Sequence, residues 1–498
     1  MSGGSGGCGA APLSLLLCLT VAVPGGASPG SGAPAAGGRA EETARIVHVL
    51  NRLGYGPRPG DVEAVRRLGP DSWVQRQLDP ARIDDARAQA RVADLATATL
   101  PIAELRKGYE VPREARREIQ KRRAEMGENP SEDDARRARR EMVRKYAGEM
   151  KGSPRQVVDE LQQAKVLRAV YSERQLDEVL VDFWMNHFNV YASKGPERFL
   201  VGAYEREVIR PHAWGRFEDL LAATAKSPAM LFYLDNWLSS DPEATSFRRR
   251  TRGLNENYAR EIMELHTLGV DGGYTQKDVT EVARSLTGWT IAGLRDGGEP
   301  RFTFNARMHD RDDKLILGRR VKGGGQEEGE QVIHMLAVHP QTARFISYKL
   351  ARRFVADEPP AALVDRAAET FRKTGGDIRA VVTTIVTSPE FFASEARGTK
   401  VKTPLEFVAS AVRASGAEVS NARDLAHRIA LMGMPLYQQQ PPTGYKDTAD
   451  AWVSTSGMLA RMNLAADLAA GRVPGVSIDP RAVADSGRGL GSPDFQRR

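Results

Sequence analysis

Polar side chains interrupt otherwise apolar segments at three places in this sequence. Their residue types make these positions the best candidates for catalytic or ligand-binding residues. The first is FWMNHFNV, in which Asn186 and His187 stand among aromatic residues. Burying an amide or an imidazole costs free energy unless each is hydrogen-bonded. An imidazole also exchanges protons and ligates metals near neutral pH. Asn186 and His187 are therefore our first candidate site residues.

The second place is the segment NENYAREIMELHTLGVDGG, residues 255–273, which has helical spacing and good capping residues at both ends. On a helical wheel one polar arc carries Glu256, Asn257, Arg260, Glu261 and Glu264. His266 falls on the opposite, apolar side, beside Tyr258. We take Asn257, Arg260, Glu261 and His266 as candidates from this segment.

The third place is MHDRDDK, which puts His309 in a loop between two possible strands. The full candidate site is Asn186, His187, Asn257, Arg260, Glu261, His266 and His309. A metal or haem site would need ligands from several segments to converge, for example His187, Glu261, His266 and His309. The alternatives are a metal-free polar network and separate buried histidines. The spacing does not decide among them, so metal and cofactor stay open.

Several familiar chemistries are excluded by missing motifs. After the N-terminal leader, the sequence has no HExxH zinc motif, no ExxH spacing of di-iron bundles, no GxSxG elbow and no GxxxxGK[ST] phosphate loop. Its two cysteines, Cys8 and Cys18, both lie near the N-terminus. The folded body therefore has no disulfide, no thiolate metal site and no cysteine nucleophile.

The charge balance argues against a nucleic-acid-binding protein. The 71 Lys and Arg residues are nearly offset by 64 Asp and Glu residues, which leaves a net charge of +7 over 498 residues. Nucleic-acid recognition usually needs a concentrated basic face with interleaved aromatic residues, and no stretch of this sequence combines the two. We therefore expect no nucleic-acid partner.

The elements that would position the candidate residues are helical almost throughout, so the sequence predicts an all-α fold. We expect one large helical domain over residues 42–472, with at most a small β-hairpin near 301–320, formed by Arg301–Asn305 and Lys314–Arg320. The highly charged segment 106–151 predicts a solvated helix or helical hairpin, broken at Gly127–Pro130. Residues 473–498, rich in Gly, Pro, Asp and Ser, predict a disordered tail.

The N-terminus predicts export. Residues Ala11–Val23 form an apolar run of signal-peptide length, followed by small residues suited to cleavage, although no Lys or Arg precedes the run. We assign residues 1–38 to a signal peptide and flexible leader. The mature chain is then expected in the periplasm or outside the cell, without a transmembrane anchor.

Several sequence blocks together resemble a known family. The blocks are HVLNRLGYG (48–56), FWMNHFNV (183–190), AMLFYLDN (229–236), the segment 255–289, HDRDDKLILG (309–318), HPQTARFISYKLARRFV (339–355), GDIRAVVTTIVTSPEF (376–391), KVKTPLEFVASAVRA (400–414) and PTGYKDTADAW (442–452). The chain is similar, over roughly residues 45–470, to the bacterial family known as domain of unknown function 1800. The resemblance implies an exported, largely helical protein. It also implies a partner, because members are often encoded beside an exported sulfatase/phosphatase-like protein.

Two functions are open at this point. The first is an exported, envelope- or polymer-associated enzyme with a polar site in its helical core. The alternative is a non-enzymatic binding or assembly factor that contacts the neighbour-encoded partner through the charged segment 106–151. The sequence does not decide whether the protein is an enzyme.

Overall fold

The computed structural model describes residues 36–125, 131–146, 148, 150–243, 253–479 and 489–498. The chain divides into two compact units, Met1–Glu42 and Thr43–Arg498, and every candidate site residue lies in the second. The predicted signal peptide, except for the start of helix α1 at Ala36, lies outside the described residues. The second unit therefore holds the fold that positions the site.

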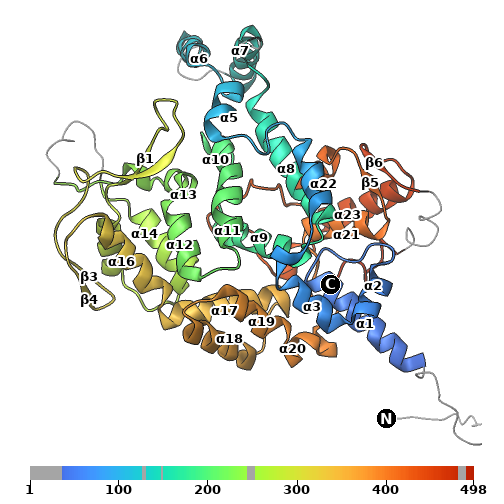
Figure 1. The fold of residues 1–498 in the computed structure, drawn as a ribbon. Coiled ribbons are helices and arrows are strands. Elements are labelled where there is room, and N and C mark those ends of the chain that lie inside the picture. The colour runs from blue at the N-terminus through green and yellow to red at the C-terminus, as the bar shows by residue number, and fades with distance from the viewer. Residues whose placement is uncertain (1–35, 126–130, 147, 149, 244–252, 480–488) are drawn as a thin grey trace, which may run out of the picture. The chain divides into compact units, whose positions relative to one another are not determined.

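The fold is mainly helical, which confirms the all-α prediction (Figure 1). The first helices are α1 (Ala36–Arg52), α2 (Asp61–Leu68), α3 (Pro70–Gln77), α4 (Ala86–Ala93), α5 (Ile102–Tyr109), α6 (Arg113–Glu125), α7 (Glu132–Lys145), α8 (Pro154–Tyr171), α9 (Gln175–His187), α10 (Glu197–Ala203), α11 (Arg210–His212), α12 (Phe217–Lys226) and α13 (Pro228–Tyr233). The remainder are α14 (Glu256–Met263), α15 (Gln276–Ser285), α16 (Gln326–Ala337), α17 (Pro340–Phe354), α18 (Ala361–Thr374), α19 (Ile378–Val386), α20 (Pro389–Phe392), α21 (Pro404–Ala414), α22 (Arg423–Leu431) and α23 (Thr455–Ala469).

Short antiparallel hairpins supplement the helices. The strand pairs are β1 (Trp289–Ala292) with β2 (Arg301–Phe304), β3 (Lys314–Ile316) with β4 (Arg319–Val321), and β5 (Glu418–Val419) with β6 (Val476–Ser477). The predicted pairing of 301–305 with 314–320 is therefore wrong. Leu317 and Gly318 both have positive φ, at 48° and 73°, so the second segment turns back on itself in a two-residue hairpin.

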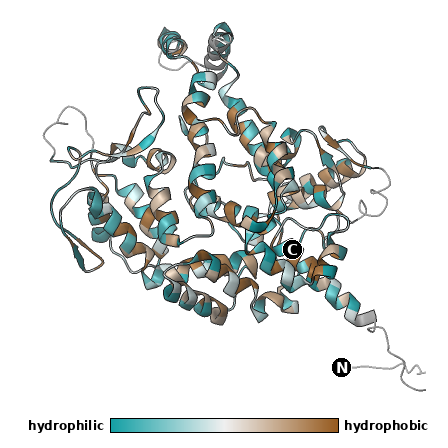
Figure 2. Cartoon of the chain, in the orientation of Figure 1, coloured by the Kyte–Doolittle hydropathy of each residue, from teal (hydrophilic) through white to brown (hydrophobic). Residues whose placement is uncertain are grey.

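The core lies along apolar helix faces, and some helices are buried on nearly every side. In α9 most side chains are buried, including Trp184 and Leu180. In α21 all positions from Pro404 to Arg413 are buried. A helix that is hydrophobic all round belongs in the interior. Figure 2 shows the contrast with α6, whose residues are almost all hydrophilic. The end of α9, which carries Asn186 and His187, is therefore set in the core.

The charged segment is a pair of helices. Helices α6 and α7 pack on each other, joined by ion pairs from Arg122 to Glu141 and from Lys145 to Glu118 (Figure 1). The predicted break at 127–130 lies outside the described residues, between the two helices. The segment begins later than predicted, because α5 buries Tyr109 and its neighbours in the core. Within the part of the chain that the structure describes, no helix is both long and apolar enough to cross a membrane.

The end of the chain packs against the rest of the unit. Leu490, Gln496 and Arg498 are buried, and the Arg498 backbone N–H donates to the Lys400 carbonyl. The prediction of a disordered tail over 473–498 therefore fails for residues 489–498, and it also fails for 473–479, where β6 pairs with β5 and Val473 and Val476 are buried. The prediction rested on composition alone. A few buried side chains and ion pairs are enough to hold a segment in one conformation even when it is otherwise rich in Gly, Asp and Ser.

Candidate functional site

The helix that carries His266 begins and ends where its sequence predicts. Asn255 caps α14 by accepting a hydrogen bond from the Tyr258 backbone N–H at 3.2 Å. After α14 the chain continues through a π-helical turn, Glu264–Leu268, and stops at Gly269 with φ of 82°. A Cβ at Gly269 would come within 3.0 Å of the Phe345 ring, so this glycine lets α17 approach closely. Local sequence thus places His266 beside α17.

The structure brings His187 and His266 together. His187 is the last residue of α9, and its Nε2 lies 3.1 Å from the His266 carbonyl oxygen. That carbonyl belongs to the last turn of a helix, where carbonyls have no partner further along the helix. The two imidazole rings are 6.2 Å apart and both are buried. Two of the polar groups expected inside the core are therefore neighbours there.

A residue that sequence reasoning missed completes this arrangement. Lys349 on α17 places its Nζ 2.8 Å from His187 Nδ1. A carbonyl oxygen can only accept, so Nε2 carries the proton given to the His266 carbonyl, and Nδ1 accepts from the Lys349 amine. Lys349 was detectable in principle, because it follows Ile346 by three residues and precedes Leu350 on the buried side of the helix. His187 is thus a neutral imidazole that holds an amine in place.

Burial and mutual charge perturb all three groups. Burial lowers the pKa of Lys349 to about 8, with the Arg352 charge acting in the same direction and Asp447 opposing it. Burial, followed by the Lys349 charge, lowers the pKa of His266 to about 3 and holds that of His187 well below its ordinary value. Both histidines are therefore neutral at physiological pH, and Lys349 is the group of the three that can change its protonation state there.

Lys349 and His187 line a cavity of about 200 Å³. It is lined by the end of α9, by α17 and by the segment that contains Thr443, Tyr445 and Asp447. Its lining residues include four cationic side chains, Lys349, Arg352, Arg353 and Lys446, and two carboxylates, Asp182 and Asp447. Asp182 is already paired with Lys165 at 2.7 Å. Arg353 pairs with Glu406 at 2.7 Å and Arg352 with Glu358 at 2.9 Å, so Lys349 and Lys446 are the cations that a small anionic ligand would meet in the cavity.

Asn186 holds one wall of the cavity in place. Its side chain donates to the Tyr445 carbonyl at 2.8 Å and accepts from the Tyr445 N–H at 2.7 Å. Gly444, with φ of 69°, lies so close that a Cβ would be 2.2 Å from the Asn186 carbonyl oxygen. Asn189 adds bonds to the carbonyls of Gln439 and Pro441 at 2.9 Å each. Asn186 is thus a positioning residue rather than one that faces the cavity freely.

The polar arc of α14 mostly contacts its neighbouring helix. Asn257 is exposed, and Arg260 donates to Gln276 at the start of α15 at 2.8 Å. Glu261 is half-buried, and burial together with the Glu264 charge raises its pKa to about 7. These three predicted residues do not line the cavity at His187.

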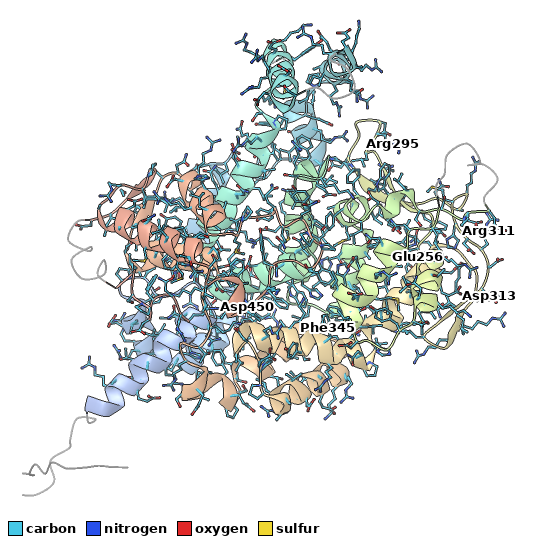
Figure 3. The ribbon with its side chains drawn as sticks, turned by 180° about the vertical axis from the view of Figure 1, so that it is seen from behind. Glu256, Arg295, Arg311, Asp313, Phe345 and Asp450 are labelled. Carbon is cyan, nitrogen blue, oxygen red and sulfur yellow. The ribbon has the colours of Figure 1, made fainter. Side chains whose placement is uncertain are left out.

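His309 belongs to a different network. Its Nδ1 lies 2.8 Å from the Thr287 carbonyl and its Nε2 lies 2.9 Å from Glu328. Glu328 also pairs with Lys314, whose side chain is 0% exposed. In Figure 3, Phe345, a neighbour of the His187 ring, lies near the centre, while Arg311 lies at the edge. Placing His309 in one site with His187 and His266 was wrong, because a loop histidine gives no signal of which part of the core receives it.

The geometry does not support the multi-segment metal site. Within the described ranges of the chain, no group of three or more His, Cys, Asp or Glu side chains is placed to hold a metal ion. His187 and His309 are each committed to other partners, and the Nδ1 of His187 faces an ammonium rather than open space. The four ligands considered, His187, Glu261, His266 and His309, do not converge.

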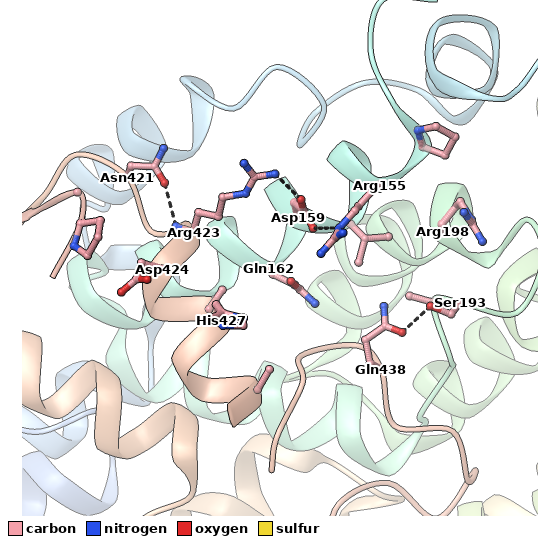
Figure 4. Close-up of a pocket in the computed structure, with 17 residues that line it drawn as sticks. Arg155, Asp159, Gln162, Ser193, Arg198, Asn421, Arg423, Asp424, His427 and Gln438 are labelled. Carbon is pink, nitrogen blue, oxygen red and sulfur yellow. Dashed lines mark hydrogen bonds and ion pairs between the residues drawn. The ribbon is translucent and has the colours of Figure 1, made fainter. Parts of the chain in front are cut away.

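A larger hollow lies elsewhere and contains none of the predicted residues. It has a volume of about 1000 Å³ and is bounded by α8, α22 and the segments near Ser193 and Gln438 (Figure 4). Its ionic side chains are largely paired, since Arg423 binds Asp159 at 2.7 Å and Asp424 binds Arg428 at 2.6 Å. We therefore place the candidate reaction site at the smaller cavity, where a group with a perturbed pKa faces space.

Comparison with known proteins identifies the family. The family described as "Protein of unknown function (DUF1800)" matches residues 48–493. The chain belongs to this family. The match runs across the helices that form the His187 cavity and includes the segment after residue 473. No curated protein and no solved structure matches the chain. The family description carries no activity, so the geometry of the site is the guide to function.

Proposed function

We propose that this DUF1800 protein is an exported enzyme that performs acid–base chemistry on a small anionic substrate, or on the anionic end of a larger molecule, at the cavity of Lys349. The observation that carries the proposal is the Lys349–His187 pair. An amine whose pKa is near 8 is poised close to working pH, which suits a general base. The buried imidazole that accepts from it fixes its position.

The reaction that fits this arrangement is removal of a proton from a carbon next to a carboxylate. The neutral amine of Lys349 would take the proton, so that a C–H bond breaks and an N–H bond forms. The electron pair moves into the carboxyl group and then forms a carbon–carbon double bond as an oxygen substituent on the next carbon leaves. The Lys349 ammonium returns the proton to that oxygen. An unsaturated acid and an alcohol result, and no oxidant or reductant is needed.

The surrounding charges suit this step. Such a proton is acidic enough only if cations neutralise the charge that develops on the carboxyl group. Lys446 lies at the cavity with a side chain that is 75% exposed and has only a 3.8 Å contact to Asp450, so it can turn to a ligand. Arg352 lines the same cavity, although Asp357 and Glu358 already engage part of its guanidinium.

The test is a screen for turnover with matched variants. Wild-type protein is incubated with a panel of uronic acid oligosaccharides and hydroxy acids, and formation of the unsaturated acid is followed by ultraviolet absorbance. Lys349→Met should lower the rate by about 10²-fold or more, the scale of a lost general base. Lys226→Met is the control, since Lys226 pairs with Glu330 outside the cavity.

Two results would count against the enzyme. One is turnover that Lys349→Met leaves unchanged. The other is an equal loss of rate in Lys349→Met and Lys226→Met, which would indicate a general effect on folding. His187→Gln should reduce the maximal rate and move its pH dependence, because the amine would lose the imidazole that holds it.

A binding or assembly role is the second candidate, and the helical pair α6–α7 favours it. Its two helices pack on each other, and most of their described side chains are exposed and charged. The partner would be the exported sulfatase/phosphatase-like protein that the family resemblance suggests. Removing residues 113–145 and repeating a pull-down with that protein separates the two roles: unchanged recovery would rule out α6–α7 as the contact.

Export is a proposal of its own, supported by the apolar run Ala11–Val23 and the small residues after it. Expression of the full chain in a bacterial host, followed by fractionation and mass spectrometry of the N-terminus, tests it. A periplasmic product that begins near Ser28 or Gly37 is expected. An uncleaved product in the cytoplasm would contradict export.

A further inference from the structure

Another hollow, separate from the Lys349 cavity, has six arginines among its lining residues. Its volume is about 620 Å³, and it lies where α5 and the start of α6 meet the segment Gly195–Phe199 and the residues around Trp237. The arginines that line it are Arg106, Arg113, Arg116, Arg117, Arg198 and Arg295. The acidic residue among its lining residues is Glu110. We call this hollow the arginine pocket.

The lining of the arginine pocket holds more guanidinium groups than carboxylates, six against one. Glu110 is shared by Arg106 and Arg116, at 2.9 Å from each. Arg113 donates to a carbonyl, that of Arg295, which removes no charge. The Arg295 guanidinium lies over the Trp237 ring at 4.7 Å. Six guanidinium groups therefore line one hollow that has a single carboxylate among its lining residues, and this excess of positive charge favours an anionic ligand.

The arginine pocket adjoins the hollow of about 1000 Å³ that α8 and α22 bound. Pro154 and Arg198 line both. The larger hollow contributes neutral hydrogen-bonding groups, among them Gln162, Ser193 and Gln438, which Figure 4 shows around it. Its Arg155 and Arg423 are both drawn to Asp159, at 3.7 and 2.7 Å. Together the two hollows, which we call the groove, have a cationic end and a neutral, amide-rich end that adjoin at Arg198.

We infer that this groove binds an acidic polysaccharide. Guanidinium groups pair with sulfate or carboxylate in a two-pronged fashion, and amides and hydroxyls pair with sugar hydroxyls, so the two ends match the two kinds of group on such a chain. A single-stranded nucleic acid would need free aromatic faces on which bases stack. The Trp237 ring is already engaged by Phe232, stacked at 5.4 Å, and by Arg295.

The inference is tested by binding of a fluorescent heparin oligosaccharide, followed by anisotropy at low salt. The variant Arg113→Ala/Arg117→Ala/Arg295→Ala should weaken binding by about 10-fold or more, since each lost charge contact is worth a few-fold. The control, Arg301→Ala/Arg307→Ala/Arg319→Ala, removes the same charge from exposed positions outside the groove and should change affinity by less than about 3-fold. Thermal melts check that both variants fold.

Each other outcome overturns the inference. Equal weakening in both variants would show attraction to net charge alone. Absence of heparin binding by the wild-type protein would leave no acidic-polysaccharide site. Tighter binding of a single-stranded oligonucleotide than of heparin, lost in the same variant, would assign the groove to nucleic acid instead. Binding of neutral dextran as tightly as heparin would show that the arginines do not select the ligand. The Lys349→Met variant should bind heparin as the wild type does.

Discussion

Replacing Glu328 by glutamine tests whether the His309 network is structural. Glu328 is 1% exposed, pairs with Lys314 and accepts from His309 Nε2 and from the backbone N–H of Gly325. The glutamine would keep one acceptor but would present an amide to the Lys314 ammonium, which is 0% exposed. The remaining anion near Lys314 is Asp310, at 3.6 Å.

The expected cost follows from that geometry. Breaking a buried ion pair while leaving one charge in place costs about 3–5 kcal/mol. Asp310 still attracts Lys314, so we expect the lower end, about 3 kcal/mol. Glu330→Gln is a matched control two residues further along α16. Glu330 also pairs with a lysine, Lys226, but its side chain is 40% exposed. Such a surface pair is worth about 0–1 kcal/mol.

Urea unfolding followed by tryptophan fluorescence measures both variants. Trp289 packs against α16, because a Cβ at Gly329 would lie within 2.4 Å of its ring, so the signal reports on this region. The free energy of unfolding should fall by several times more in Glu328→Gln than in Glu330→Gln. Similar losses in the two variants would refute the network. The pH dependence should agree: hydrogen bonds hold the pKa of Glu328 below its ordinary value despite burial, so its stabilisation is lost as pH falls through that lowered pKa.

Two further predictions concern stability. The pKa of Glu261 is raised from 4.5 to about 7, so the folded state favours the neutral acid and is penalised once that acid ionises. Glu261→Gln should therefore raise the melting temperature more at pH 8 than at pH 5. A larger rise at pH 5 than at pH 8 would contradict the raised pKa. Gly444→Ala should destabilise by more than about 1 kcal/mol and speed proteolysis near residue 444. Gly398→Ala, with φ of 62° and no atom within 4 Å, is its control, and an equal effect in both would show that contact with Asn186 is unimportant.

The helical fold could be predicted because its signals are local. The caps at Asn255 and Thr275 and the stop at Gly269 are hydrogen bonds and backbone angles within a few residues of each other, and all three occur in the structure. The β1 strand, Trp289–Ala292, was not predicted, since an apolar run of that length has no periodicity to separate strand from helix.

The site could be predicted only in part because its contacts are distant in sequence. His187 and His266 were found as polar residues in apolar segments, and they meet. Lys349 was missed although its position on α17 places it among buried residues, because it sits in a basic run in which lysine is unremarkable. Its partner His187 is 162 positions away in the chain. No local sequence pattern predicts the contact between Lys349 and His187. None predicts that His309 lies apart from His187 and His266.

The most direct test of the proposed site is the protonation of Lys349 itself. Wild-type protein is treated briefly with acetic anhydride across a pH series, and acetylation of each lysine is quantified by mass spectrometry. Lys349 should reach half of its maximal reactivity near pH 8, whereas Nα-acetyl-lysine added to the same sample should do so at about pH 10. His187→Gln should change the Lys349 curve and leave that of the added amine unaltered. A Lys349 curve that follows that of the added amine would contradict the proposal that this amine is a base at neutral pH.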